Sequence, residues 1–252
     1  MTPLTDSPFL VLVLTFLTLW ACAWIGAKVL GRYAAEGQQA REDFRTVLAA
    51  CLTLLGLIVG FSFSMAVSRF DMRQNAESAE ANAIGTEYTR ADLLPPTEAA
   101  ATRQLLHSYL TERIQFFGAR DRDRFRQIDE RTTRLQRQMW PAVRSPAVQP
   151  NQFTALAVSG MNDVLSTQSN TRAAWWNRIP AEAWALMGLI AILCNLMLGV
   201  SARHLEGRSV FVVLPLVTAI AFFLIADIDS PAGGGVIHVT PQNLLGVEEL
   251  MR

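Results

Sequence analysis

Small residues recur every fourth position in the apolar stretch 46–68, beside a stripe that could line a passage for ions. The small residues are Gly56, Gly60, Ser64 and Ser68, and the neighbouring stripe is Thr53, Leu57, Phe61 and Met65. Small residues at this spacing let helix backbones approach closely in lipid. One interpretation is ordinary helix packing through Gly56 and Gly60. The other is a helix beside a central axis, with Thr53, Leu57, Phe61, Ser64 and Ser68 lining a pore.

Catalytic chemistry has little support in this sequence. The three histidines lie in different segments, and no HExxH, GxSxG or Walker pattern occurs. Glu80, Glu87 and Asp92 fall on one predicted helix, where carboxylates on an exposed surface are common. We therefore predict that the protein is not an enzyme.

The cysteines give no indication of a metal site or a disulfide framework. Cys22, Cys51 and Cys194 all lie in apolar stretches, and none has a CxxC or Cys/His neighbour. They are expected to act as small apolar residues. We predict no metal and no cofactor.

Four windows of the sequence are almost free of charge: 9–27, 46–68, 183–202 and 209–226. Each is close to the length that a helix needs to cross a hydrocarbon core of roughly 30 Å. The chain is 51% hydrophobic and 17% charged, with no net charge, so the charges gather between these windows. The sequence predicts an all-α, multi-pass membrane protein with four transmembrane helices, whose direct partner is the lipid bilayer.

A long polar segment separates the second window from the third and carries several helical patches. Each patch has one apolar stripe, and such stripes must be buried against one another, which predicts a helical bundle. Thr97 is expected to cap one of its helices. The apolar residues of the last patch are Phe153, Leu156, Met161, Val164 and Leu165. Arginine and aspartate alternate around 121–134, so no nucleic-acid partner is predicted. The expected domains are transmembrane helices 1 and 2 in 1–68, the extramembrane bundle in 69–179, transmembrane helices 3 and 4 in 180–229, and a tail in 230–252.

The stretch 60–70 resembles the neck helix of bestrophins. A Gly60-Phe61 pair precedes an apolar run that ends in Arg69-Phe70, where such a helix leaves the membrane. The longer string 60–95 and the ending 227–233 are similar to bacterial bestrophin-like membrane proteins. The resemblance implies a homo-oligomeric, pentameric ion channel in a bacterial inner membrane. It also implies that the second helix lines the pore, that Arg69 and Phe70 mark its exit and that small inorganic ions are its cargo.

Two departures from the bestrophin pattern limit what the resemblance implies. Thr53 stands where a bulky apolar neck residue is usual. The acidic calcium clasp of animal bestrophins has no counterpart, since Asp227 and Asp229 alone do not form such a cluster, and no calcium gating is expected. The alternative function is a membrane-anchored helical sensor or scaffold without transport activity. The orientation stays open, because the positive-inside rule places the bundle outside and the resemblance places it in the cytosol.

Overall fold

The computed structural model describes residues 7–30, 38–145, 149–202, 210–231 and 235–252. In these ranges the regular secondary structure is entirely helical, which confirms the all-α prediction. The chain divides into two compact units, 1–68 with 178–237 and 69–177 with 238–252. Each unit is described by itself below.

The four apolar windows are confirmed as helices. They correspond to α1 (Pro8–Lys28), the first part of α2 (Gln38–Arg90), α6 (Ala181–Ala202) and α7 (Val210–Asp229). All four are long and apolar enough to cross a membrane. Pro8 stands in the first turn of α1, where its fixed φ suits a helix and its missing N–H costs no hydrogen bond.

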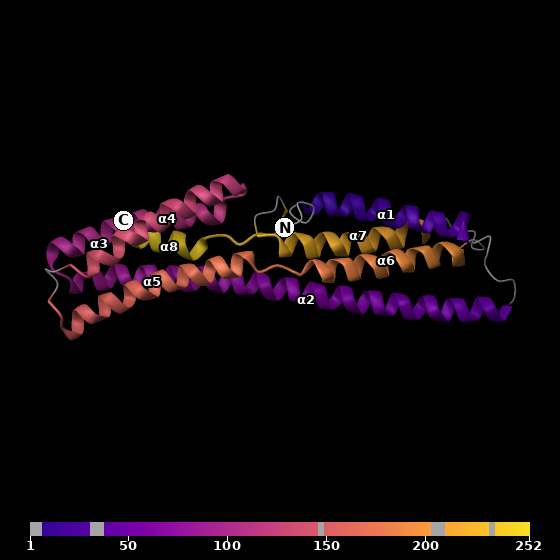
Figure 1. The fold of residues 1–252 in the computed structure, drawn as a ribbon, viewed down its shortest axis with the longest axis horizontal. Helices are drawn as coiled ribbons and strands as arrows, with labels where there is room; N and C mark the ends of the chain where they lie inside the picture. Colours follow the sequence, from indigo (N-terminus) through magenta and orange to yellow (C-terminus); the bar gives the residue numbers. More distant parts are fainter. Residues whose placement is uncertain (1–6, 31–37, 146–148, 203–209, 232–234) are drawn as a thin grey trace. The chain divides into compact units, whose positions relative to one another are not determined.

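In the first unit, α1 packs along both α6 and α7 (Figure 1). The contact between α1 and α6 is close because two glycines face backbone atoms of the opposite helix. A Cβ on Gly26 would overlap the carbonyl oxygen of Leu196, and one on Gly199 would overlap that of Ala23. Such close approach of backbones is the usual means of helix association in lipid.

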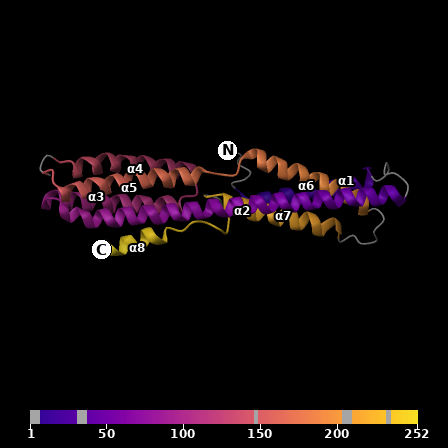
Figure 2. The ribbon, with the colours of Figure 1, turned by 90° about the horizontal axis from the view of Figure 1, so that it is seen from below.

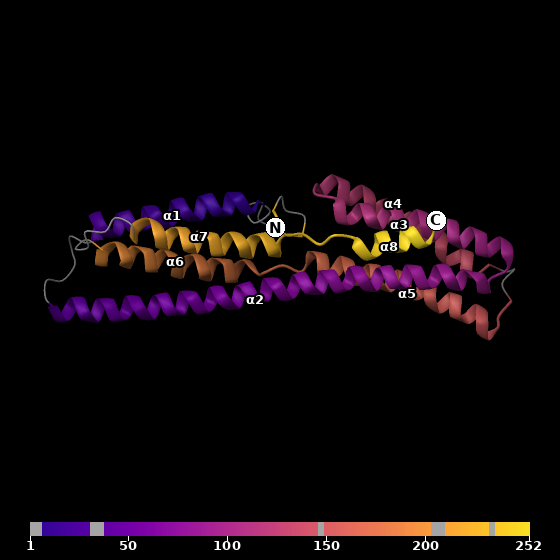
Figure 3. The same cartoon turned by 180° about the vertical axis from the view of Figure 1, so that it is seen from behind.

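The second unit contains the end of α2, the short 3₁₀ helix η2 (Ala91–Leu93) and four α-helices. The α-helices are α3 (Pro96–Gly118), α4 (Arg122–Val143), α5 (Gln152–Trp176) and α8 (Gln242–Leu250). Figure 2 shows α3, α4 and α5 running beside one another, and Figure 3 shows α8 beside α3. Phe116, Phe117 and Phe125 pack around Trp175, with ring centroids 5.0–6.1 Å from the indole.

Two details of the predicted bundle are wrong. Thr97 does not cap α3, because Pro95 takes the cap position with an extended ψ of 152° and Pro96 begins the helix. Phe153 and Leu156 are 55% and 47% exposed, whereas Met161 and Val164 of the same predicted patch are buried, because the buried face of α5 passes through Ala157, Met161 and Val164.

Candidate functional site

The apolar part of α2 has one buried face and one open face. Leu48, Leu55, Ser62 and Ala66 are buried within the chain. Only 17% of this apolar window is buried, compared with 22–44% in the other three candidate spans. Among these four spans, α2 therefore has the least contact with its own chain.

All five predicted pore residues lie on the open face of α2: Thr53, Leu57, Phe61, Ser64 and Ser68 are exposed. Leu57 is 54% and Phe61 65% exposed, which is high for large apolar side chains. The hydroxyl of Thr53 donates to the carbonyl of Ala49 at 2.9 Å, so it offers mainly its methyl group and oxygen lone pairs to its surroundings. The predicted stripe is thus free to meet lipid, water or another copy.

The two glycines predicted to pack helices also lie on this open side. A Cβ on Gly56 or Gly60 would have no atom within 4 Å. Among the helices that the structure describes, none packs against these glycines, and their packing role stays a prediction about contacts between copies. The predicted exit residues Arg69 and Phe70 are half-buried.

Further along α2, the buried face changes from apolar to charged. Residues at alternating spacings of four and three point into the second unit and are at most 1% exposed: Arg73, Glu77, Glu80, Ile84, Glu87 and Ala91. We call this row the polar seam. It corrects the sequence interpretation of Glu80 and Glu87 as carboxylates on an exposed helix. Asp92 alone fits that interpretation, with a side chain 63% exposed that pairs with Arg103.

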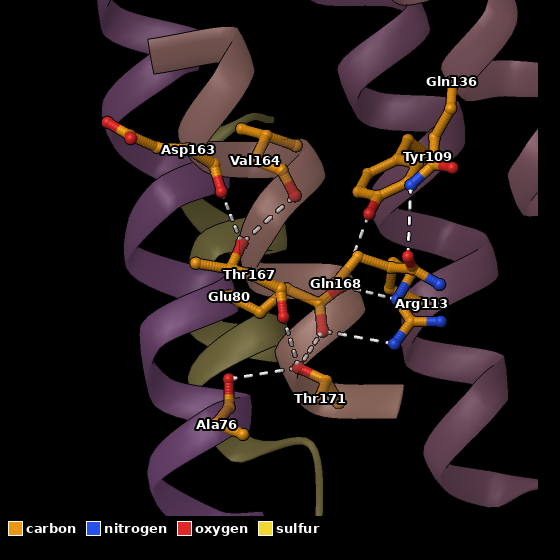
Figure 4. A network of polar contacts seen from close by, with 10 residues as sticks. All are labelled: Ala76, Glu80, Tyr109, Arg113, Gln136, Asp163, Val164, Thr167, Gln168 and Thr171. Carbon is orange, nitrogen blue, oxygen red and sulfur yellow. Dashed lines mark hydrogen bonds and ion pairs between the residues drawn. The ribbon is translucent and has the colours of Figure 1, made fainter. Parts of the chain in front are cut away.

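Glu80 is the centre of a buried network that joins three helices (Figure 4). From α3, the Arg113 Nε donates to one carboxylate oxygen at 2.5 Å, and its Nη2 donates to the other at 3.2 Å. From α5, the Thr171 hydroxyl donates to Glu80 Oε2 at 2.8 Å. Tyr109 adds its hydroxyl at 3.5 Å. The network therefore ties α2, α3 and α5 together through one side chain.

The Glu80–Arg113 pair is fully desolvated. Burial, the largest single cause, would lower the pKa of Arg113, but the charge and hydrogen bond of Glu80, together with smaller contributions from Tyr109 and Asp129, raise the pKa overall. The guanidinium carbon also lies 4.4 Å from the centroid of Phe116, where cation–π attraction adds to the pair. Burial raises the pKa of Tyr109, and the Glu80 carboxylate adds to that shift, so the phenol stays a neutral donor.

Glu77 fixes the helix α8 onto α2. Its Oε1 accepts from the backbone N–H of Leu244 at 3.0 Å, and its Oε2 accepts from Asn243 Nδ2 at 2.6 Å. A helix begins with four N–H groups that lack partners inside the helix, so a carboxylate at this point acts as a cap supplied from elsewhere in the chain.

Glu77→Ala is expected to release α8 while leaving the rest of the second unit folded. Removing such an acceptor costs about 1–3 kcal/mol, which is enough to free a helix of nine residues. Limited proteolysis within 238–250 should become several-fold faster. Glu249→Ala is the matched control, because it removes an exposed carboxylate near the other end of the same helix. Equal cleavage of both variants would contradict the role of Glu77.

The two carboxylates at the end of α7 bind backbone groups. Asp227 is 1% exposed and accepts from the N–H of Val236 at 2.9 Å and from that of Ile237 at 3.0 Å. Asp229 accepts from the N–H of Ile179 at 3.1 Å, just before α6. Gly235 is required beside Asp227, because a Cβ there would overlap its carboxylate. The sequence comparison with a calcium clasp did not reveal this structural role.

Within the described residues, no group of three or more His, Cys, Asp or Glu side chains could hold a metal ion. Asn195, buried in α6, donates to the carbonyl of Ala191 in its own helix at 2.8 Å. The candidate site therefore consists of the open face of α2, with the polar seam further along the same helix.

Comparison with known proteins identifies the family to which this chain belongs. The model of the bestrophin-like domain matches residues 12–244, nearly the whole chain. The chain belongs to the bestrophin-like family. Among curated protein sequences, none matches this bestrophin-like chain.

The bestrophin-like chain shares its fold with crystal structures of a bacterial bestrophin homologue from Klebsiella pneumoniae. For one mutant of that protein the TM-score is 0.70 at 13% identity, covering 100% of this chain and 97% of the other. A structure of that homologue from zinc-based phasing gives a TM-score of 0.67 at 14% identity, with 96% of each chain covered. The predicted resemblance to the bestrophin-like family and its fold is thereby confirmed for the chain as a whole.

Proposed function

We propose that this bestrophin-like chain assembles into a homo-oligomeric, pentameric ion channel in which α2 lines the pore. The observation that carries the proposal is the open face of α2. It presents Leu57 and Phe61 outward at 54% and 65% exposure, together with threonine, serine and glycine, and none of the described residues of its own unit covers it.

The chemistry of this face suits a pore better than a lipid surface alone. Hydroxyl groups add nothing to a helix face that contacts only lipid. The hydroxyls of Ser64 and Ser68 on the open face can instead coordinate a passing ion in place of water. Leu57 and Phe61, one turn apart, would form narrow apolar rings that gate by dewetting. Gly56 and Gly60 would let neighbouring copies of α2 approach closely.

Leu57→Ala/Phe61→Ala is expected to widen the constriction and raise single-channel conductance several-fold in reconstituted bilayers. Smaller side chains leave room for water where the apolar ring excluded it. The measurement is the current from purified protein in planar bilayers. Leu189→Ala/Leu216→Ala is the matched control, since these leucines are 56% and 42% exposed but lie on α6 and α7 instead of α2.

Unchanged conductance and gating in the Leu57/Phe61 variant would remove both residues from the pore. The assembly has its own test, a projection of purified particles along the membrane normal. A five-fold ring with α2 on the axis supports the channel, whereas a monomer or dimer supports a membrane-anchored sensor or scaffold. Because the family is bacterial in the structures compared, we place the protein in the inner membrane as a multi-pass protein.

A further inference from the structure

Glu87 differs from the other carboxylates of the polar seam because its oxygens have no partner. The residue is 0% exposed. Both Oε1 and Oε2 are buried without a hydrogen bond in the described part of the chain. A buried carboxylate without donors is strongly disfavoured in its charged form, since burial removes the water that would stabilise the charge.

The register of the helices explains the missing partners. The pairs Glu80–Arg113 and Tyr88–Arg103 show that α3 runs antiparallel to α2, and Thr171–Glu80 with Gly160–Glu87 show the same for α5. Seven residues beyond Glu80 lies Glu87. Seven residues before Arg113 on α3 lies Leu106, which is 0% exposed, and the α5 residue against Glu87 is Gly160, so neither helix offers a side-chain donor there as Arg113 and Thr171 do for Glu80.

Few charged groups interact with Glu87. Arg90, on its own helix, favours the ionised carboxylate, and Asp163, on α5, opposes it. These two groups interact with each other, with Arg90 Nη1 at 3.9 Å from Asp163 Oδ2 and side chains 32% and 58% exposed. Burial, the largest cause, raises the pKa of Glu87 from its ordinary value of 4.5 to about 8.

Close packing against α5 leaves little space around the Glu87 carboxyl, so the contact depends on whether that carboxyl is neutral or charged. A Cβ on Gly160 would overlap Glu87 Oε2 and approach Arg90 Nη1 to 2.7 Å. The glycine therefore leaves room for the carboxyl and nothing more. An ionised carboxylate would be stabilised by water or by a hydrogen bond from the neighbouring Arg90 guanidinium, and we expect α5 to move away from α2 to admit either.

We propose that Glu87 is a proton-binding site of the second unit, which holds a proton in neutral solution and loosens the contact between α2 and α5 at Gly160 when it releases that proton. The step moves one proton from the carboxyl to water, and the carboxylate that remains competes with Asp163 for Arg90. The proposal rests on contacts within one chain and does not depend on ion permeation.

The sign of the pH dependence follows from linkage. Between 4.5 and about 8 the folded chain holds a proton on Glu87 that the unfolded chain has lost. The contribution of this site to the free energy of unfolding is therefore fully present below pH 4.5. It is lost as the pH rises toward about 8. The melting temperature of the full chain in detergent should fall across this window. In Glu87→Gln the fall should be smaller, because a neutral amide cannot ionise.

Infrared difference spectroscopy gives the direct test. The wild-type protein should show the carbonyl stretch of a protonated carboxylic acid at neutral pH, and this band should disappear above pH 8. The band should be missing in Glu87→Gln and retained in Glu130→Gln, which makes the same change at an exposed position. Absence of the band in the wild type, or its persistence in Glu87→Gln, would overturn the proposal.

Amide hydrogen exchange of the wild type provides a test that needs no variant. Protection of residues 157–164 on α5, corrected for the chemical exchange rate, should fall by up to about tenfold per pH unit until the carboxyl is ionised. Residues 105–117 on α3 should keep their protection, because the Glu80–Arg113 pair is unaffected. Protection of 157–164 that does not change with pH would refute the loosening of α5.

Discussion

Arg113→Ala is expected to destabilise the second unit by about 3–5 kcal/mol, because it leaves the Glu80 carboxylate buried without its counter-ion. Both side chains of the pair are at most 1% exposed, so water cannot take the place of the guanidinium. A loss of this size is a large part of the total stability of a domain, which is about 5–15 kcal/mol. Denaturant unfolding of the full chain in detergent, followed by hydrogen exchange in 105–117 and 165–176, measures it.

A double variant tests whether the unpaired charge of Glu80 causes the loss of stability in Arg113→Ala. Glu80→Leu/Arg113→Leu removes both charges together and should recover most of the stability, because an apolar pair needs no solvation. Arg126→Ala is the matched control, since it breaks an ion pair with Asp123 whose side chains are 71% and 72% exposed, and should change nothing measurable. If Arg113→Ala costs no more than Arg126→Ala, the network does not stabilise the unit as argued.

Gly26→Ala is expected to have a large effect in the first unit, although it adds a single methyl group. The new carbon would overlap the carbonyl oxygen of Leu196 and lie 3.2 Å from the Cα of Gly199. Backbone atoms cannot rotate out of the way as a side chain can, so α1 and α6 must separate. Overpacking of this kind costs about 1–3 kcal/mol or more. Thermal unfolding in detergent, read as the folded fraction by size exclusion, measures the effect.

Gly188 on α6 offers a matched control for this change. A Cβ at Gly188 meets no atom within 4 Å. Gly188→Ala should therefore be neutral or stabilise its helix by about 0.5–1 kcal/mol through higher helix propensity. If the two alanine variants unfold at the same temperature, the close approach of α1 to α6 is not a determinant of stability.

The membrane helices could be predicted from the sequence because hydropathy over about 20 residues is a strong local signal. The glycines that pack α1 against α6 could not, because Gly26 and Gly199 lie in different windows and the clash depends on how two helices meet. The small-residue stripe that the sequence did emphasise, through Gly56 and Gly60, has no neighbour within its own chain.

The spacing of the polar seam is visible in the sequence, but it can also be interpreted as a solvent-exposed face. Arg73, Glu77, Glu80, Ile84 and Glu87 follow one another at spacings of four and three, which is the period of a buried helix face. Charged residues on such a face are ordinarily assigned to solvent. Only the position of Arg113, opposite Glu80 on another helix, shows that the face is buried, and that pairing is a property of the fold.

The cap that Glu77 provides for α8 has a consequence for the order of synthesis. The carboxylate and its partner Asn243 are 166 residues apart, and α6 and α7 lie between them in the chain. At ribosomal rates of about 5–20 residues per second, the synthesis of the chain from Glu77 to Asn243 takes roughly ten to thirty seconds. During that interval two membrane helices must be inserted while the nascent helical unit still lacks its last element. A chaperone or the translocon could act on the protein in that time, before α8 closes over the end of α2.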